Sequence, residues 1–143
     1  MAWKHYICEI SGKPASVLID GRFADQLPVK ELPQLSWFGV YCQQPGGAAF
    51  WNPEETDVLD RLENDLIRLS ETFGYGWVVY VLRIATPGIR EYYLYHADQA
   101  ELNKAFSALK AIYTNYRIEF ETINDKVWEQ YRKYVSYDPD GTA

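Results

Sequence analysis

The segment Trp77–Ala85 constrains the fold of this chain more than any other stretch of the sequence. It reads WVVYVLRIA and is apolar at eight of its nine positions. A strand with one face in water alternates apolar and polar residues, whereas a strand covered on both faces is apolar on both. Because a membrane span needs about 20 apolar residues, this segment is too short to be one. We therefore expect a central strand that other elements cover from two sides.

Further strands are predicted before and after this segment. Thr86-Pro87-Gly88 favours a type II turn, and Ile89–His96 returns from it as a hairpin partner. Trp3–Ile10 and Ala15–Asp20 are rich in aromatic and β-branched residues and predict an N-terminal hairpin. Leu35–Cys42 predicts a third strand of the same kind.

Residues 116–122 predict an edge strand. Apolar and charged residues alternate strictly there, with Tyr116, Ile118 and Phe120 on one face and Arg117, Glu119 and Glu121 on the other. This alternation is typical of a strand that is buried on one face and exposed on the other.

Three helices complete the pattern. The first follows Asn52 and Pro53, which suit the N-cap and the first helical position, with Glu55 where a capping-box acid belongs. The second begins at Asp98, with Glu101 as its capping-box acid. Apolar residues recur at three- and four-residue spacing, at Leu59, Leu62, Leu66, Leu69 and Phe73 in the first helix and at Leu102, Phe106, Leu109 and either Ile112 or Tyr113 in the second. A short helix from about 124 to 134 presents Val127, Trp128, Tyr131 and Val135.

The order of these elements predicts the fold class. From Leu35 onward it is strand, helix, strand, strand, helix, strand, which is the ferredoxin-like βαββαβ arrangement. We expect an α+β fold, a two-layer sandwich in a single domain over residues 1–143. The ferredoxin-like core would span 35–123, preceded by the hairpin and a connecting loop in 1–34 and followed by the C-terminal helix and tail in 124–143.

Charge and cysteine content exclude several classes of protein. The net charge of −6, with an isoelectric point of about 4.9, argues against nucleic acid or an anionic membrane as the main partner. Cys8, Cys42, His5 and His96 show no zinc-site spacing, so we expect no metal and no cofactor, and thiols that act as buried apolar groups. Since no secretory signal is recognisable after Met1 and no stretch could span a membrane, we expect a cytoplasmic protein.

No motif in the sequence is typical of catalysis. Gly74 and Gly76 end a helix instead of opening one around a phosphate group. Asp138 and Asp140 flank a proline in a turn-forming segment, where turn chemistry explains both. The sequence favours a protein without catalytic activity but leaves that question open.

The first predicted helix carries nearly all of the excess negative charge. Residues 54–73 contain seven acidic and two basic residues, which give −5 of the net −6. One interpretation is a docking face for a basic partner protein, formed by Asp57, Asp60, Glu63 and Asp65. The other is a solvated helix face with intrahelical ion pairs such as Asp57 with Arg61.

Aromatic residues are the second candidate surface, with 23 Trp, Tyr and Phe residues in 143. Strand alternation places three sets on common faces: Trp37 with Tyr41, Trp77 with Val79 and Val81, and Tyr93 with Tyr95. Such a face can be covered by the N-terminal hairpin, form a protein or homodimer contact, or stack the bases of RNA. RNA is the least favoured, because RNA-binding sheets surround the stack with basic residues and this chain does not.

A small-ligand site is the alternative. Arg90 lies beside Tyr92 in the sequence, and an arginine next to aromatic rings can hold an anion. With His96, these residues could line an aromatic pocket of a ligand-binding or enzymatic domain. The simpler interpretation of Arg90 and Tyr92 is an ordinary cross-strand contact within the sheet.

Four segments together resemble a known bacterial family, the domain of unknown function numbered 695. The segments are 3–16, the strand and acidic leucine-rich helix from Val40 onward, Gly88–Tyr95 and Asp125–Tyr131. Relatives in that family are sometimes joined to a domain similar to the bacterial regulator of ribonuclease activity B, which is ferredoxin-like and inhibitory. The resemblance therefore implies regulation by protein binding and no established activity.

From these observations we expect a non-enzymatic protein-binding or regulatory module. The specific hypothesis is an inhibitor or immunity-type antagonist of a basic nuclease. The alternatives are a small-ligand-binding or enzymatic domain around Arg90 and His96, and a homodimer whose sheet faces pack together.

Overall fold

The computed structural model describes residues 3–43, 53–73, 78–97 and 99–137. These residues form a six-stranded antiparallel sheet and three α-helices, so the mixed α+β class is confirmed. The strands are β1 (Trp3–Ile10), β2 (Lys13–Asp20), β3 (Gln34–Tyr41), β4 (Val78–Thr86), β5 (Ile89–His96) and β6 (Arg117–Asn124). The helices are α1 (Thr56–Phe73), α2 (Gln99–Ile112) and α3 (Glu129–Val135), with short 3-10 turns at Gly21–Phe23 and Pro53–Glu55.

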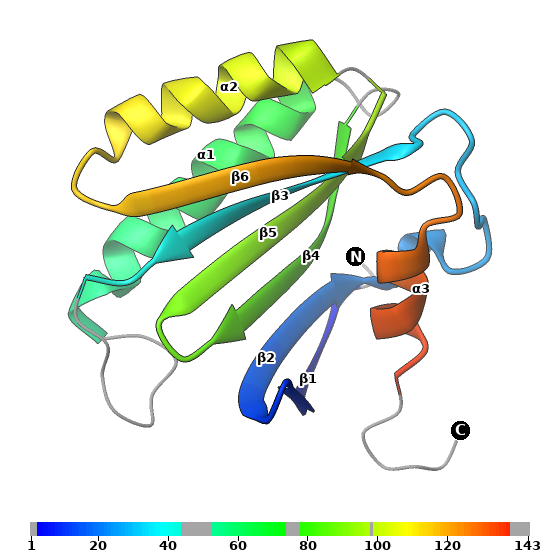
Figure 1. Cartoon of the computed structure of the whole chain (residues 1–143), viewed down its shortest axis with the longest axis horizontal. Coiled ribbons are helices and arrows are strands. Elements are labelled where there is room, and N and C mark those ends of the chain that lie inside the picture. The colour runs from blue at the N-terminus through cyan, green and yellow to red at the C-terminus, as the bar shows by residue number, and fades with distance from the viewer. Residues whose placement is uncertain (1–2, 44–52, 74–77, 98, 138–143) are drawn as a thin grey trace.

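The strands lie in the order β1-β2-β4-β5-β3-β6 in one continuous sheet (Figure 1). Strand β4 lies inside this sheet, and its apolar residues are buried on both faces, as the sequence predicts. A β-bulge between Tyr80 and Leu82 shifts its register against β5. The turn into β5 is confirmed as well, since Gly88 has the positive φ of 84° that a type II turn requires at its third position. Strand β6 lies at one edge, also as predicted.

The sheet as a whole differs from the four-stranded, ferredoxin-like sheet that we expected. The N-terminal hairpin is not an addition outside the sheet but forms two of its strands, because Ser16–Ile19 of β2 pair with Leu82–Ala85 of β4. The physical reason is the free edge of β4, whose apolar segment would otherwise expose unpaired backbone groups to water. The expected ferredoxin-like arrangement therefore does not describe this six-stranded sheet.

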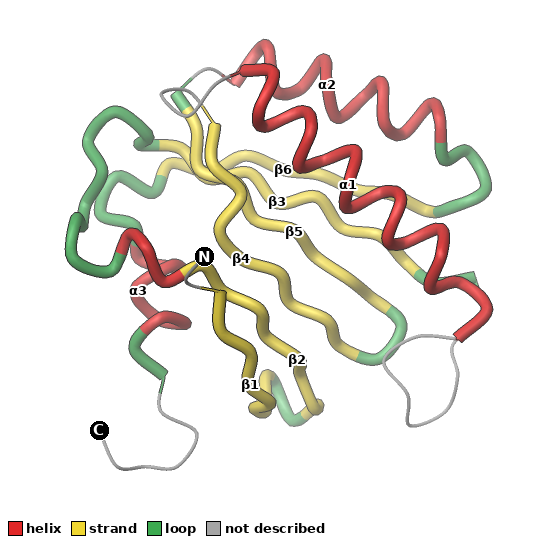
Figure 2. Tube along the Cα trace, turned by 180° about the vertical axis from the view of Figure 1, so that it is seen from behind, coloured by secondary structure: helices red, strands yellow, loops and turns green. Residues whose placement is uncertain are grey.

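Helices α1 and α2 lie next to each other on one face of the sheet, which we call the helix side (Figures 1 and 2). The predicted stripe residues Leu59, Leu62, Leu66, Leu102, Phe106 and Leu109 are buried there against residues of β3, β4, β5 and β6, namely Phe38, Val40, Val78, Tyr80, Tyr92, Leu94 and Ile118. Ile112 was expected in the stripe of α2 but is 66% exposed, because it is the last residue of the helix, and Tyr113 packs only partly against the cluster. The side chains of Leu69 and Phe73, and the predicted caps Asn52 and Asp98, lie outside the described residues.

The opposite face, which we call the open side, is covered only at one end. There Trp128, at the start of α3, is fully buried and its indole stacks on the Tyr95 ring at a centroid distance of 3.8 Å. The Trp128 Nε1 donates a hydrogen bond to the Leu32 carbonyl oxygen at 2.9 Å. Tyr131 in α3 donates to the Asp20 carbonyl oxygen at 2.6 Å. A second hydrophobic cluster forms around these rings between α3, the hairpin and β4.

Helix α3 begins later than the sequence predicts, at Glu129 instead of near residue 124. The Asp125 carboxylate accepts hydrogen bonds from the Glu129 and Gln130 amides at 2.8 and 3.2 Å, which satisfies two unpaired donors of the first turn. Tyr95 donates to the same carboxylate at 2.6 Å. Because residues 125–128 form the turn that brings Asp125 to the helix start, Val127 is exposed and not part of the buried face as we expected.

Glu55 has a contact that the sequence did not predict. It lies in the 3-10 turn before α1, is buried, and accepts the Gln43 backbone amide with both carboxylate oxygens at 3.1 and 3.2 Å. The carboxylate therefore joins the end of β3 to the start of α1, whereas the predicted capping-box partner, Asn52, lies outside the described residues. Sequence spacing could not show this, because Gln43 is twelve residues away.

We predict that Trp128→Ala lowers the free energy of unfolding by about 3–5 kcal/mol, because it removes a fully buried ring and leaves a cavity over Tyr95. The neighbouring Val127 is 57% exposed, so Val127→Ala should change this value by about 0.5 kcal/mol or less. Denaturant unfolding of both variants measures the difference. Equal, small losses in the two variants would show that α3 does not anchor the open side.

Candidate functional site on the open side of the sheet

The open side brings together aromatic and acidic residues from three adjacent strands. Trp37 on β3 lies opposite Tyr93 on β5 and opposite Glu121 on β6. Two positions along, Gly39 lies between Glu91 and Glu119 in the same way. Because alternate residues of a strand share a face, Trp37, Tyr41, Tyr93 and Tyr95 all lie on this side. We call the set Trp37, Tyr41, Glu91, Tyr93, Glu119 and Glu121 the Trp37 face.

The Trp37 indole lies over Gly39. A Cβ atom built on Gly39 would be 3.2 Å from the indole Cζ3, closer than most carbon contacts, so the ring uses the space that the missing side chain leaves. Trp37 is only half-buried, and within the described part of the chain it belongs to neither of the two hydrophobic clusters. Core packing therefore does not account for a tryptophan at this position.

Tyr41 and Arg117 extend the face toward the far end of β3. The Arg117 guanidinium lies 4.2 Å from the centroid of the Tyr41 ring and pairs with Glu119 at 2.8 Å. The Tyr41 hydroxyl donates a hydrogen bond to the other Glu119 oxygen at 3.0 Å. The hydrogen bonds from Arg117 and Tyr41 lower the pKa of Glu119, so this carboxylate is negative at neutral pH.

Glu91 is the most enclosed carboxylate of the Trp37 face. Burial raises its pKa, and a hydrogen bond from the Tyr93 hydroxyl partly offsets that effect. Burial also raises the pKa of Tyr93, followed by the effect of the neighbouring Glu91 charge. The two side chains thus form one hydrogen-bonded unit beside Trp37.

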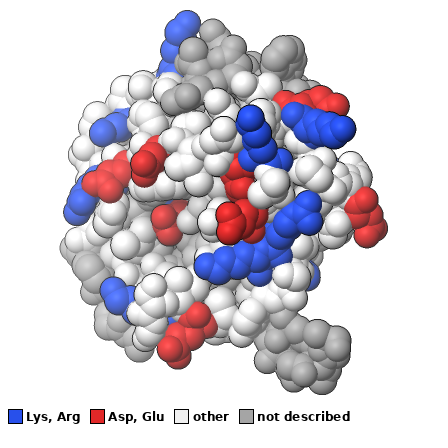
Figure 3. Space-filling model, turned by 45° about the vertical axis from the view of Figure 1, so that its right-hand side comes forward, with Lys and Arg blue, Asp and Glu red and all other residues white. Residues whose placement is uncertain are grey.

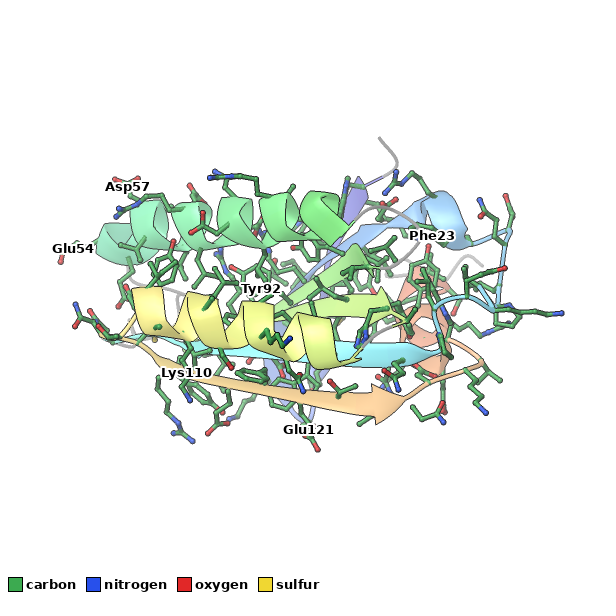
Figure 4. The ribbon with its side chains drawn as sticks, turned by 90° about the horizontal axis from the view of Figure 1, so that it is seen from above. Phe23, Glu54, Asp57, Tyr92, Lys110 and Glu121 are labelled. Atoms are coloured by element: carbon green, nitrogen blue, oxygen red, sulfur yellow. The ribbon has the colours of Figure 1, made fainter. Side chains whose placement is uncertain are left out.

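The arrangement is suited to positively charged side chains. A partly exposed indole can attract a lysine or arginine cation over its ring, and carboxylates around it form charge-assisted hydrogen bonds with the same groups. Glu121 points away from the helices, on the opposite side of the sheet from Tyr92 (Figure 4). Figure 3 shows acidic and basic side chains next to each other on the side of the molecule that carries α3. This side of the molecule therefore carries charges of both signs, and the charge that a ligand meets depends on where on the surface it binds.

Tyr95 shares this side but is not available to a ligand. Its ring is covered by Trp128, and its hydroxyl donates to Asp125 and accepts the Tyr131 backbone amide at 3.2 Å. Burial, followed by the hydrogen bond to Asp125, raises the pKa of Tyr95. Of the three predicted aromatic site residues, Trp37 and Tyr93 lie on the Trp37 face, whereas Tyr95 fastens α3.

The four predicted acidic residues of α1 divide into two pairs. Asp57 and Asp60 are exposed, and Asp57 lies on the outer side of α1 (Figure 4). Glu63 is half-buried and accepts Arg83 of β4 at 2.6 Å. Asp65 accepts the Tyr113 hydroxyl at 2.6 Å and pairs with Arg68 at 3.3 Å. Two of the four carboxylates therefore serve contacts within the molecule.

The residues of the predicted ligand site do not come together. Arg90 and His96 stand at opposite ends of β5, opposite Val40 and Gln34 of β3, which separates them by about 20 Å at 3.4 Å per residue. Tyr92 is buried under the helices, where burial raises its pKa to about 12. His96 is buried and its Nε2 lies 2.7 Å from the Ser36 hydroxyl. No common pocket around Arg90 and His96 follows from this geometry.

The described residues contain no group of three His, Cys, Asp or Glu side chains that could hold a metal ion. In the same part of the chain, no helix is long and apolar enough to cross a membrane. Cys8 and Cys42 are free thiols, and burial raises the pKa of each, so both are protonated at neutral pH.

Sequence reasoning missed Gly39 and the position of the acidic face of β6 next to Trp37. A glycine inside a predicted strand, two residues after a tryptophan, is a usable signal, because glycine there often marks a close approach. The neighbourhood of Trp37, Glu91 and Glu119 has no local signal, since the three residues meet only through strand pairing.

We predict that Gly39→Ala displaces the Trp37 indole, because the new methyl group would lie 3.2 Å from its Cζ3. The Trp37 indole NH resonance should shift in NMR spectra, while that of Trp128, which lies in the α3 cluster, should stay in place. Since Trp37 packs in neither cluster, stability should change by about 1 kcal/mol or less. An unchanged Trp37 resonance would show that the ring does not use the space over Gly39.

We predict that Glu91→Gln is more stable than the unmodified protein at pH 7. Because the pKa of Glu91 is raised in the folded protein, ionising it opposes folding, and stability falls as the pH rises above its ordinary value of 4.5. The gain from glutamine should shrink as the pH falls below that value. Unfolding at pH 4 and pH 7 measures it, with the exposed-site variant Glu121→Gln as control. A larger gain at pH 4 than at pH 7 would contradict this account.

Comparison with known proteins adds a family but no activity. The model of a family of unknown function, DUF695, matches residues 1–136 of the 143. No curated protein and no solved structure is significantly similar to the chain. Because the family model covers nearly the whole chain, the protein belongs to the family of unknown function DUF695.

Proposed function

We propose that this protein is a non-enzymatic, regulatory protein-binding module that docks a basic segment of its partner on the Trp37 face. The observation that carries the proposal is Trp37 itself, a half-buried indole that packs in neither cluster and lies in register among Glu91, Glu119 and Glu121. A partly exposed aromatic ring within a polar surround is typical of a protein-binding surface.

Charge favours a basic partner at this face. Glu91, Glu119 and Glu121 lie around the indole, and the one nearby arginine of β6, Arg117, pairs with Glu119 and lies over the Tyr41 ring, so acidic groups outnumber basic ones at this face. A lysine or arginine of the partner would gain both a carboxylate and the indole ring. The long-range field of a protein with a net charge of −6 would also speed the encounter.

The Trp37 face suits docking better than α1, which we considered first. Of the four acidic residues predicted on α1, only Asp57 and Asp60 are exposed, because Glu63 and Asp65 are half-buried and pair with Arg83 and Tyr113. Helix α1 also lacks an exposed aromatic ring next to its carboxylates among its described side chains. Its acidic residues then serve solubility and steering instead of specific contact.

A module of this kind can act as an inhibitor by covering positive charge. Nucleases hold the phosphate backbone with lysine and arginine, so a protein that occupies those residues competes with the nucleic acid. The hypothesis of an inhibitor or immunity-type antagonist is compatible with this chemistry and is the regulatory role that we propose.

The test uses three labelled nine-residue peptides of matched length, one rich in lysine and arginine, one acidic and one neutral. We expect the basic peptide alone to bind, measured by fluorescence anisotropy, and binding to weaken with added salt. Trp37→Ala should weaken it by about tenfold, as loss of a cation–π contact of about 1.4 kcal/mol implies. Because Trp37 is outside both clusters, this variant should remain folded.

The double variant Asp57→Asn, Asp60→Asn is the matched control, since it removes two exposed charges on the other side of the molecule. It should leave the affinity for the basic peptide within about twofold of that of the unmodified protein. If this control abolishes binding and Trp37→Ala does not, the docking surface is α1. If the acidic or neutral peptide binds as well as the basic one, the proposal of a basic partner is wrong.

A further inference from the structure

The outer edge of β6 is a free strand edge within the described part of the sheet. Strand β6 is the last of the sheet, and within the described part of the chain it pairs only with β3. It is eight residues long, and its outward amide and carbonyl groups have no strand partner there. A long edge of this kind is a template for another extended chain.

The other edge of the sheet is different. Strand β1 is joined to α3, because Lys4 donates to the Val135 carbonyl oxygen at 2.8 Å and Tyr6 donates to the Tyr134 carbonyl oxygen at 2.7 Å. These bonds place the C-terminal helix beside β1. Of the two edges, β6 is thus the one that borders the Trp37 face.

We infer that the partner's basic segment binds as an extended seventh strand along β6, with lysine or arginine at alternate positions. This inference rests on the proposed function and specifies how the segment docks. Side chains of an added strand would alternate between the two sides of the sheet. Those on the open side would lie about 5 Å from Glu119 and Glu121, the usual distance of cross-strand pairs, and could reach Trp37 on the next strand.

Charge on the two sides of β6 explains why the basic residues should alternate. On the open side the strand presents Glu119 and Glu121. On the helix side Lys110 of α2 lies close enough to lower the pKa of Glu119 together with Arg117 and Tyr41. A segment that is basic at every position would place cations next to Lys110 as well, so like charges would oppose it. Neutral residues on that side avoid the repulsion.

A second copy of this chain fits the edge less well. Antiparallel pairing of two β6 strands would bring the Glu119 and Glu121 carboxylates of each copy to one interface. The only cation on that face of β6, Arg117, is already held by Glu119 and the Tyr41 ring. Two copies also carry −6 each, which opposes their association. A partner with lysine or arginine on alternate positions meets neither obstacle.

The test compares the binding of two peptides to the 143-residue protein. The first is a nine-residue peptide of alternating lysine and threonine; the second is the same peptide with N-methyl groups on alternate backbone amides, which keeps its charge and removes its ability to pair along one edge. We expect the N-methylated peptide to bind at least about tenfold more weakly. We also expect amide protons of β6 to gain protection from hydrogen exchange when the unmethylated peptide binds.

The outcomes separate this inference from the proposed function. If both peptides bind equally, a basic chain docks on the Trp37 face without strand pairing, and only the present inference is wrong. If neither binds, the proposed docking of a basic segment is wrong as well. If β6 is protected without peptide and the protein runs at twice its monomer mass, a second copy occupies the edge and the inference is overturned.

Discussion

The two-sided burial of β4 is the constraint on which the rest of the structure depends. Its apolar residues face both sides of the sheet, so each side needs a cover. On one side α1 and α2 supply it with the apolar stripes of two long helices. The other side is covered by the N-terminal hairpin, by the loop before β3, and by α3. Helix α3 has only seven residues. The area that α3 can bury is therefore limited to one end of the open side.

The way α3 is fastened decides which residues remain for function. Trp128 stacks on the ring of Tyr95, and Asp125 accepts a hydrogen bond from the Tyr95 hydroxyl. These two contacts fix α3 over the end of β5. Two residues earlier on the same strand, Tyr93 is only partly covered, and across from it Trp37 lies outside the clusters. Strand β5 thus passes from the fully buried Tyr95 to the partly buried Tyr93 within two residues, and the candidate site begins where the cover of α3 ends.

The acidic residues of this protein fall into two groups, according to whether they mainly join parts of the fold or lie on an accessible surface. Glu55, Glu63, Asp65 and Asp125 are bound to groups of the protein itself, and they connect segments that are distant in sequence. Glu119 and Glu121 are exposed on an edge strand next to an indole, where a partner can reach them, although Glu119 also pairs with Arg117 and accepts the Tyr41 hydroxyl. Charge density along the sequence is highest on α1, but the geometry of the sheet makes the less dense charges of β5 and β6 the better candidates for recognition.

The sequence by itself determined the secondary structure and the core of both helices, because these depend on local periodicity: the two-sided apolar pattern of β4, the leucine stripe of α1 and the alternation of β6. Tertiary structure alone decided that the hairpin joins β4 in the sheet, that α3 starts after Asp125, and which side stays open. It also decided that Trp37, Glu91 and Glu119 meet. Those outcomes depend on strand order and register, which join residues up to 90 positions apart, as between Gln34 and Asn124, and leave no periodic signal in the chain.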